Sequence, residues 1–385
     1  MENQKNLILA VTFSIIVLLV FDTFFTKPRM VENQPNETSN TEKVNEGIIP
    51  EVNNKIISKT ENIPYNEDRI YFDMNRIKGS INLYGATIDD VSLKDYKESI
   101  NQESKNIRVL NPENSKSPFL VRTDWASQNS KFLPNKNTLW SSNKKQYKTG
   151  EVIELTWSNK LGITFKKNIT IDTNFIFKVE DTIINNSNKN IDVTNYSLIQ
   201  RKNYKPENKF FILHEGPLGV FNDTLKEVSY NDLQDSNEIK ESTTNGWIGI
   251  TDHYWQVVIF SEAEKKINAR FKYLNKTKNS IQVDYINEDL NSVEPGKKFS
   301  SLSYIFAGAK EVPLIDSYIK KLNINKFDLS IDFGWFYFLT KPLFYALNYL
   351  SLMFNNFGVG IVILTIFVRL ILFPLANKSF KSMNS

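Results

Sequence analysis

Two apolar stretches near opposite ends of the 385-residue chain constrain its architecture more than any other feature. The first spans 7–25 (LILAVTFSIIVLLVFDTFF) and the second spans 357–376 (FGVGIVILTIFVRLILFPLA). Each is close to the ~20 apolar residues that a helix needs to cross ~30 Å of hydrocarbon. The region between them is far more polar. The pattern therefore predicts a membrane protein with a transmembrane α-helix near each end and a large water-exposed region between them.

A cleavable signal peptide is the main alternative for the first stretch. Signal peptides have an apolar core of about 7–15 residues, followed by small residues at the cleavage site. The stretch at 7–25 is longer, and the residues that follow its core, such as Phe24, Phe25 and Lys27, suit a signal peptidase poorly. We therefore favour an uncleaved span, with Asp22 near the headgroups.

The orientation follows from the basic residues that flank the second span. Lys378 and Lys381 come directly after it, whereas 342–356 contains no lysine or arginine. We therefore expect the segment 377–385 to be cytoplasmic. Two spans place the N-terminal residues 1–6 on the same side, which leaves the middle of the chain in the periplasm.

Composition excludes several kinds of chemistry. The chain has no cysteine, which rules out disulfides and thiolate metal sites within it, and its two histidines are too few for a three-histidine metal site. The net charge of +4 comes from 47 basic and 43 acidic residues, a balance too even to indicate a nucleic-acid partner. We expect no cofactor, no metal and no enzymatic activity.

The two histidines each follow or precede a carboxylate in the sequence. Adjacent residues on a strand point to opposite faces, so neither pair forms an acid–base dyad by itself. We expect both histidines on the surface of strands or loops, and we expect the nearby aromatic residues in a core. These residues are His214 and His253, and Trp247, Tyr254 and Trp255.

The middle of the chain divides into a tether and a β-domain. Residues 26–68 are rich in Asn, Glu, Thr and Lys and are typical of a flexible linker. From 69 to about 310 the apolar residues recur with period two, as in 174–184 and 300–306, and polar turns such as Pro295-Gly296 separate the runs. This pattern predicts a large antiparallel β-sandwich.

We place this β-domain at 69–325 and expect a helix at its end. Apolar residues recur at helical spacing over 312–322, and Pro313 suits a first helical turn. Within 300–306, Leu302, Tyr304 and Phe306 are expected to share one face.

A second amphipathic helix is expected at 334–354, lying in the headgroup plane. Its polar stripe (Tyr337, Lys341, Tyr345, Asn348) recurs at spacings of four and three, and Pro342 is expected to start or kink it. A third span is the alternative, but the lysine–proline pair and the short link to 357–376 argue against it. The expected interfacial anchors are Trp335, Phe336, Phe338, Phe344 and Lys341.

Arg369 is the single charge within the second span. It lies about seven residues, or ~10 Å of helix rise, from the cytoplasmic end, where a charge costs on the order of 2–3 kcal/mol. Either it snorkels to the headgroups, or it faces a hydrated cavity. Thr365, one turn away on the same face, favours a polar stripe.

Together these features resemble a known family. The GWF…PLF segment from Gly334, the NxG entry to the second span and the ILTIFVRLILFPL stretch with its arginine are similar to membrane protein insertases of the YidC/Oxa/Alb family from Gram-negative bacteria. The NLILA start and the GWIGITDHYW segment fit as well, so the resemblance covers nearly the whole chain.

The resemblance implies an inner-membrane insertase and chaperone, Sec-dependent or Sec-independent. Its periplasmic domain would be a β-supersandwich like that of galactose mutarotase, without epimerase activity. Arg369 and Thr365 would line a substrate groove, with Arg369 attracting acidic residues of the incoming segment. The implied partners are nascent inner-membrane proteins, the Sec translocon, membrane lipid and, through cytoplasmic regions outside this chain, the ribosome.

The chain also departs from the family pattern. The family core has five spans, and this chain contains only the first of them before the cytoplasmic hairpin begins at 377–385. We therefore expect the chain to be a fragment. The rival hypothesis is a membrane-tethered periplasmic module that binds glycan or peptide.

Overall fold

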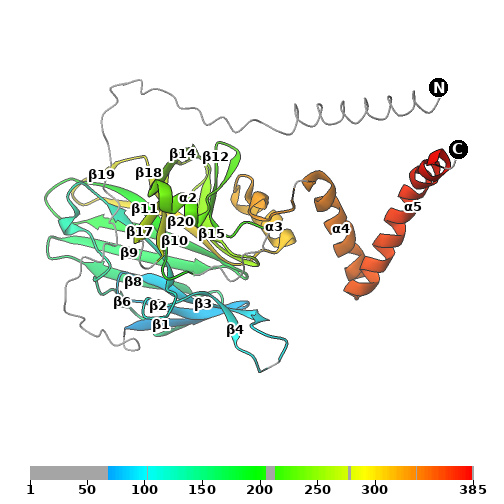
Figure 1. Ribbon diagram of the computed structural model, residues 1–385. Helices are drawn as coiled ribbons and strands as arrows, with labels where there is room; N and C mark the ends of the chain where they lie inside the picture. The colour runs from blue at the N-terminus through cyan, green and yellow to red at the C-terminus, as the bar shows by residue number, and fades with distance from the viewer. Residues whose placement is uncertain (1–67, 102, 205–212, 276–278, 335, 384–385) are drawn as a thin grey trace, which may run out of the picture. The chain divides into compact units, whose positions relative to one another are not determined.

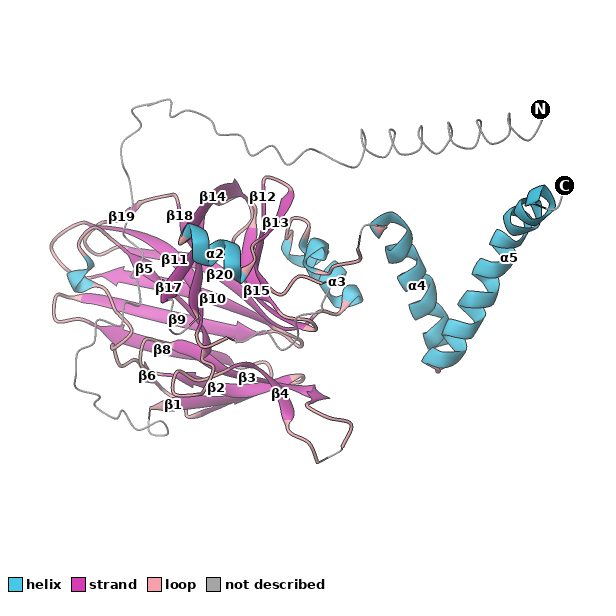
Figure 2. Ribbon diagram, in the orientation of Figure 1, coloured by secondary structure: helices cyan, strands magenta, loops and turns pink. Residues whose placement is uncertain are grey.

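The computed structural model describes residues 68–101, 103–204, 213–275, 279–334 and 336–383. The expected span at 7–25 lies outside the described residues, as does the expected tether apart from its last residue. The described part consists of two β-sheets followed by helices (Figures 1 and 2).

One sheet contains 11 of the described strands. Its order is β14 (Glu238–Thr244), β17 (Lys266–Asn275), β18 (Ser280–Asn287), β11 (Ile191–Arg201), β5 (Phe119–Ala126), β3 (Thr87–Lys97), β2 (Ile77–Asn82), β1 (Arg69–Asp73) and β7 (Gln146–Lys148), with β19 (Asn291–Val293) paired to β11 and β4 (Asn106–Leu110) paired to β3.

The other sheet contains nine described strands. Its order is β13 (Thr224–Glu227), β12 (Gly216–Phe221), β15 (Trp247–Thr251), β16 (Trp255–Ser261), β20 (Lys298–Ala309), β10 (Ile176–Asn185), β9 (Ile163–Ile171), β8 (Val152–Ser158) and β6 (Ser141–Ser142). Among the described strands only β1 and β7 pair in parallel, so the sandwich is antiparallel as predicted.

Short helices complete the domain, and two longer ones follow it. The short helices are η1 (Ser130–Phe132), α2 (Tyr230–Ser236), α3 (Val312–Leu322) and η2 (Phe327–Ser330). The two longer helices are α4 (Tyr337–Met353) and α5 (Phe357–Met383).

Alternation along the strands builds the core between the sheets. On β10, Phe177, Val179 and Ile183 are buried, whereas Lys178 between them is exposed. This is the period-two pattern that the sequence predicts, because successive side chains of a strand leave opposite faces. The turn at Gly296 has the predicted positive φ of 74°, which glycine adopts without a Cβ clash.

α3 covers part of the outer face of the nine-stranded sheet. Its Ile315 and Tyr318 are buried, and the Tyr318 ring meets the Phe306 ring edge-on at 6.0 Å between centroids. Leu302, Tyr304 and Phe306 share a face as expected, but this is the outer face: Ser303, on the inner face, is fully buried.

One prediction about the aromatic residues is wrong. Trp247 is fully buried and Trp255 is partly buried against the core, but Tyr254 is 63% exposed. Tyr254 lies in the turn between β15 and β16, where the chain leaves the sheet and the inward–outward alternation ends.

A buried polar cluster joins the two sheets. Lys167 on β9 and Asp181 on β10 are direct cross-strand neighbours and form an ion pair with side chains 2% and 1% exposed. The Lys167 ammonium also donates to the Thr123 backbone carbonyl at 2.8 Å and to its hydroxyl at 2.7 Å. Thr123 and Asn195, which both donate to Asp181, belong to the opposite sheet, so the cluster ties the sheets together.

Candidate functional site

A tight turn connects α4 to α5, and the two helices contact each other next to it. Asn355 has a positive φ of 49°, and the side-chain oxygen of Asn356 accepts from the backbone of Val359 at 3.2 Å, which caps α5. Gly360 of α5 sits against α4: a Cβ at this position would lie 3.1 Å from the backbone nitrogen of Ser351. The glycine therefore permits the close approach of the two helices.

α4 is amphipathic and exposes most of its large apolar side chains. Pro342 lies inside the helix, which begins at Tyr337, so the proline does not start it. Among the predicted anchors, Phe336 is 55% and Phe338 is 60% exposed, and Phe344 is half-buried against Phe333. The remaining aromatic anchor, Trp335, lies outside the described residues.

The fifth predicted anchor, Lys341, has a protein partner. Its ammonium lies 2.7 Å from Asp328 Oδ2 on η2 and 2.7 Å from the Tyr337 hydroxyl, which itself donates to Asp328 at 2.5 Å. Asp316 of α3 lies 3.8 Å from the same ammonium. Burial would raise the pKa of Asp328, but the hydrogen bonds from Lys341 and Tyr337 outweigh it and hold that pKa below its usual value. The first half of the polar stripe thus contacts the end of the β-domain.

Replacing Asp328 with asparagine is expected to loosen the start of α4. A partly buried ion pair contributes ~1 kcal/mol, so amide hydrogen exchange in the first two turns of α4 should rise about fivefold. K341M should have a similar effect, and the double variant should add little to either. K320Q, at an exposed lysine of α3, is the matched control. Unchanged exchange in D328N would show that this contact does not hold the helix.

α5 presents apolar side chains outward along most of its length. By length and composition, Phe357–Pro374 is the one stretch of the described residues that suits a membrane span, and 6% of it is buried. A core helix of a soluble protein would be mostly buried, so the low burial of this stretch agrees with the predicted span. α5 continues to Met383 without a break, beyond the expected end at 376, because bilayer thickness limits a span but not the helix that contains it.

Thr365 and Arg369 lie four residues apart on one face of α5, and both are exposed. The Thr365 hydroxyl donates to the Ile361 carbonyl at 2.7 Å, as expected for threonine within an apolar helix. Within the described residues Arg369 has no ion-pair or hydrogen-bond partner. The helix therefore presents one unpaired charge in its apolar stretch.

Comparison with known proteins decides the family. The model of the YidC periplasmic domain family matches residues 69–346, which include the sandwich, α3, η2 and the first part of α4. The chain belongs to the YidC family of membrane protein insertases. The membrane protein insertase YidC of Rickettsia bellii is 37% identical over 388 residues, which cover 99% of this chain and 68% of the relative. That of Rickettsia prowazekii is 37% identical over 391 residues, covering 99% and 69%.

Solved structures are similar to part of the chain at low identity. A galactose mutarotase related enzyme from Lactobacillus acidophilus is 12% identical with a TM-score of 0.43, and covers 62% of this chain and 97% of its own. A galactose mutarotase-like protein from Lactobacillus casei is 9% identical with a TM-score of 0.41, covering 62% and 99%.

YidC membership establishes the broad function. The chain is of an inner-membrane protein with a periplasmic β-domain, and its function is the insertion of membrane proteins. The family is one of insertases rather than of enzymes that catalyse a bond change. The rival hypothesis of a glycan- or peptide-binding module as the main function is therefore not favoured. The predicted antiparallel β-sandwich is confirmed by the two sheets and by the family match, and the predicted membrane protein by the family.

Proposed function

We propose that α5 forms one wall of a hydrated groove in the inner membrane and that Arg369 attracts acidic residues of an incoming segment there. The observation that carries this proposal is the unpaired guanidinium of Arg369 on an otherwise apolar, outward-facing helix, one turn from Thr365. A charge at this depth costs on the order of 2–3 kcal/mol. Water in a groove reduces that cost, and an acidic substrate residue offsets it further.

Snorkelling to the headgroups is the competing explanation for Arg369. It would require no substrate contact. The polar face shared with Thr365 favours the groove, because a snorkelling arginine needs no second polar residue beneath it.

The proposal also covers α4, the two ends of the chain and the partners. We propose that α4 lies at the periplasmic membrane surface with its exposed phenylalanine side chains in the lipid. Lys378 and Lys381 favour a cytoplasmic end of α5, and the segments 1–6 and 7–25 would provide a cytoplasmic N-terminus and a second span. The partners would be nascent inner-membrane proteins, handled alone or with the Sec translocon and the ribosome.

Site-specific photocrosslinking in the full-length protein tests the groove. A crosslinker at Thr365 or Arg369 should capture a nascent membrane protein. The same probe at Phe367, which is 60% exposed on the opposite face of α5, should capture lipid or nothing. Equal capture from both faces, or none from Thr365 and Arg369, would contradict the groove assignment.

Charge specificity gives a second, quantitative prediction. R369Q should reduce insertion of a substrate whose translocated tail is acidic about tenfold, because an ion pair worth ~1.4 kcal/mol corresponds to that factor. R369K should retain most of the activity. A substrate with an uncharged tail should be inserted equally by all three proteins, as measured by protease accessibility of the tail. Equal losses for both substrates would point to a structural role for Arg369.

A further inference from the structure

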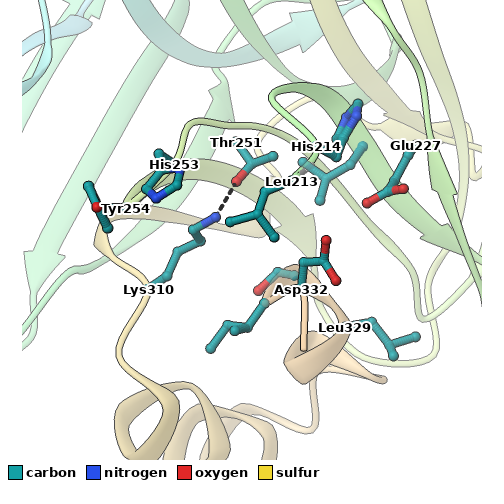
Figure 3. Close-up of a pocket in the computed structure, with 12 residues that line it drawn as sticks. Leu213, His214, Glu227, Thr251, His253, Tyr254, Lys310, Leu329 and Asp332 are labelled. Atoms are coloured by element: carbon teal, nitrogen blue, oxygen red, sulfur yellow. Dashed lines mark hydrogen bonds between the residues drawn. The ribbon is translucent and has the colours of Figure 1, made fainter. Parts of the chain in front are cut away.

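A cavity of about 140 Å³ lies beside the segment that leads from the β-domain into α4 (Figure 3). Its walls come from β12, β13 and β15, the turn after β15, Lys310 after β20, and the residues 329–332, which form the end of η2 and the segment just after it. Both histidines of the chain line it, although 38 residues lie between His214 and His253 along the sequence and each was expected on an ordinary surface. Both are half-buried loop residues.

The inner part of the cavity is built around a lysine. The Lys310 ammonium donates to the Thr251 hydroxyl at 3.2 Å, and it forms no ion pair with any carboxylate of the described residues. Figure 3 shows the Lys310 side chain reaching toward Thr251, with His253 beside it. An ammonium has three N–H donors, so two of them remain for a ligand.

Burial works against this charge. It lowers the pKa of Lys310, and the attraction of Asp252 and Asp332 opposes the effect only in part. Polar and charged groups that leave water are normally compensated by partners. An oxyanion in the cavity would supply the missing partner.

Apolar side chains make up much of the remaining wall. Leu213, Leu218, Leu329 and Ile331 surround the polar groups, and Leu218 is buried. A cavity of about 140 Å³ is several times what one water molecule needs, so it has room for a carboxylate and one medium-sized apolar side chain. The opening carries the opposite charge: Glu227 and Asp332 are exposed residues that lie across the cavity from Lys310 in Figure 3.

We propose that this cavity binds the C-terminal carboxylate of a polypeptide chain exposed in the periplasm. The carboxylate would lie against Lys310 and Thr251, the last side chain would be apolar, and a basic residue just before it would meet Glu227 and Asp332 at the opening. Capture of a chain terminus is a recurring mode of peptide recognition, and here the half-buried ammonium of Lys310 would supply the donors for the carboxylate. The site is separate from Arg369 and does not depend on the groove.

The test uses the full-length protein in detergent and a fluorescent, N-acetylated hexapeptide that ends in lysine and leucine. The free-acid peptide should bind saturably, and the same peptide with a C-terminal amide should bind at least about tenfold more weakly, because a charge-assisted hydrogen bond is lost. K310Q should weaken binding of the acid peptide by a similar factor and leave binding of the amide unchanged. K297Q, at an exposed lysine in the turn before β20, is the matched control.

A second variant keeps the test valid if K310Q folds poorly. E227Q/D332N leaves the inner cavity intact, and it should abolish the preference for lysine over serine before the terminal leucine. Equal affinity for acid and amide, binding to a folded K310Q as tight as to the parent protein, or no saturable binding would overturn the proposal. N-acetyl-leucine that binds as tightly as the peptide would also overturn it, by showing a site for small free carboxylates.

Discussion

Replacing Lys167 with methionine is expected to destabilise the β-domain by about 3–5 kcal/mol, because it leaves the buried carboxylate of Asp181 without its cation. Both side chains are almost fully buried between the sheets. Methionine matches much of the volume of lysine, so the loss reports the charge rather than a cavity. Urea unfolding followed by tryptophan fluorescence measures the effect.

The neighbouring lysine provides a matched control. Lys166 lies next to Lys167 on β9 but points outward and is exposed, so K166M should change the free energy of unfolding by less than about 0.5 kcal/mol. The double variant K167M/D181L should recover more than half of the loss, since apolar pairs replace buried ion pairs at little cost. A loss below ~1 kcal/mol in K167M would show that the ion pair does not hold the sheets together.

Replacing Asp124 with asparagine is expected to stabilise the protein, and by more at high pH than at low pH. Asp124 is 3% exposed and forms no ion pair within the described part of the chain. Burial raises the pKa of its carboxyl from 3.8 to about 7, opposed by the attraction of Lys167 and reinforced by the repulsion of Asp181. Its ionised form is therefore the costly one in the folded state.

The sign of the pH dependence follows from this shift. Between pH 4 and 7 the folded state holds a proton that the unfolded state has released, so stability falls as the pH rises through this window and levels off above it. The shift corresponds to on the order of 4 kcal/mol above pH 7 and about 1–2 kcal/mol at pH 5. Asparagine does not titrate, so it removes this contribution to the pH dependence of stability. Its side-chain oxygen can still accept the 2.9 Å hydrogen bond from the Trp125 backbone.

Urea unfolding of both proteins at pH 5 and pH 8 provides the measurement. The difference in the free energy of unfolding between D124N and the parent protein should increase by about 2–3 kcal/mol from pH 5 to pH 8. D192N, at an exposed carboxylate on β11, should show no such growth. A constant difference between D124N and the parent protein would mean that Asp124 does not titrate in this range.

Much of the fold could be predicted because its signals are local. The alternation along 174–184 predicts β10, and the helical spacing over 312–322 predicts α3, since each depends only on side chains a few residues apart. The same alternation contains a clue to the buried ion pair: Asp181 occupies an inward position between Val179 and Ile183. The clue does not identify the partner, because Lys167 comes from the neighbouring strand β9, several residues away along the chain.

The part of the candidate site on α5 could be predicted from the sequence, whereas the contact of α4 with the β-domain could not. The pairing of Thr365 with Arg369 follows from helix geometry, so four-residue spacing is enough to place them on one face. The partner of Lys341 was not predictable, because Asp328 lies beyond a bend and a helix start. The Lys341 side chain forms an ion pair with Asp328, whereas the sequence pattern predicted that it would contact lipid headgroups.

The sequence by itself determined that the chain is membrane-bound, that its middle is a β-sandwich and that one arginine interrupts an apolar helix. These conclusions depend on bilayer thickness and on the periods of strand and helix, which a linear pattern contains in full. Only the tertiary structure decided which charges are paired: Lys167 with Asp181, Lys341 with Asp328, and Lys310 with no carboxylate in the described residues. Such pairings require segments distant in sequence to meet, because an electrostatic partner is set by distance in space and by the water excluded around it.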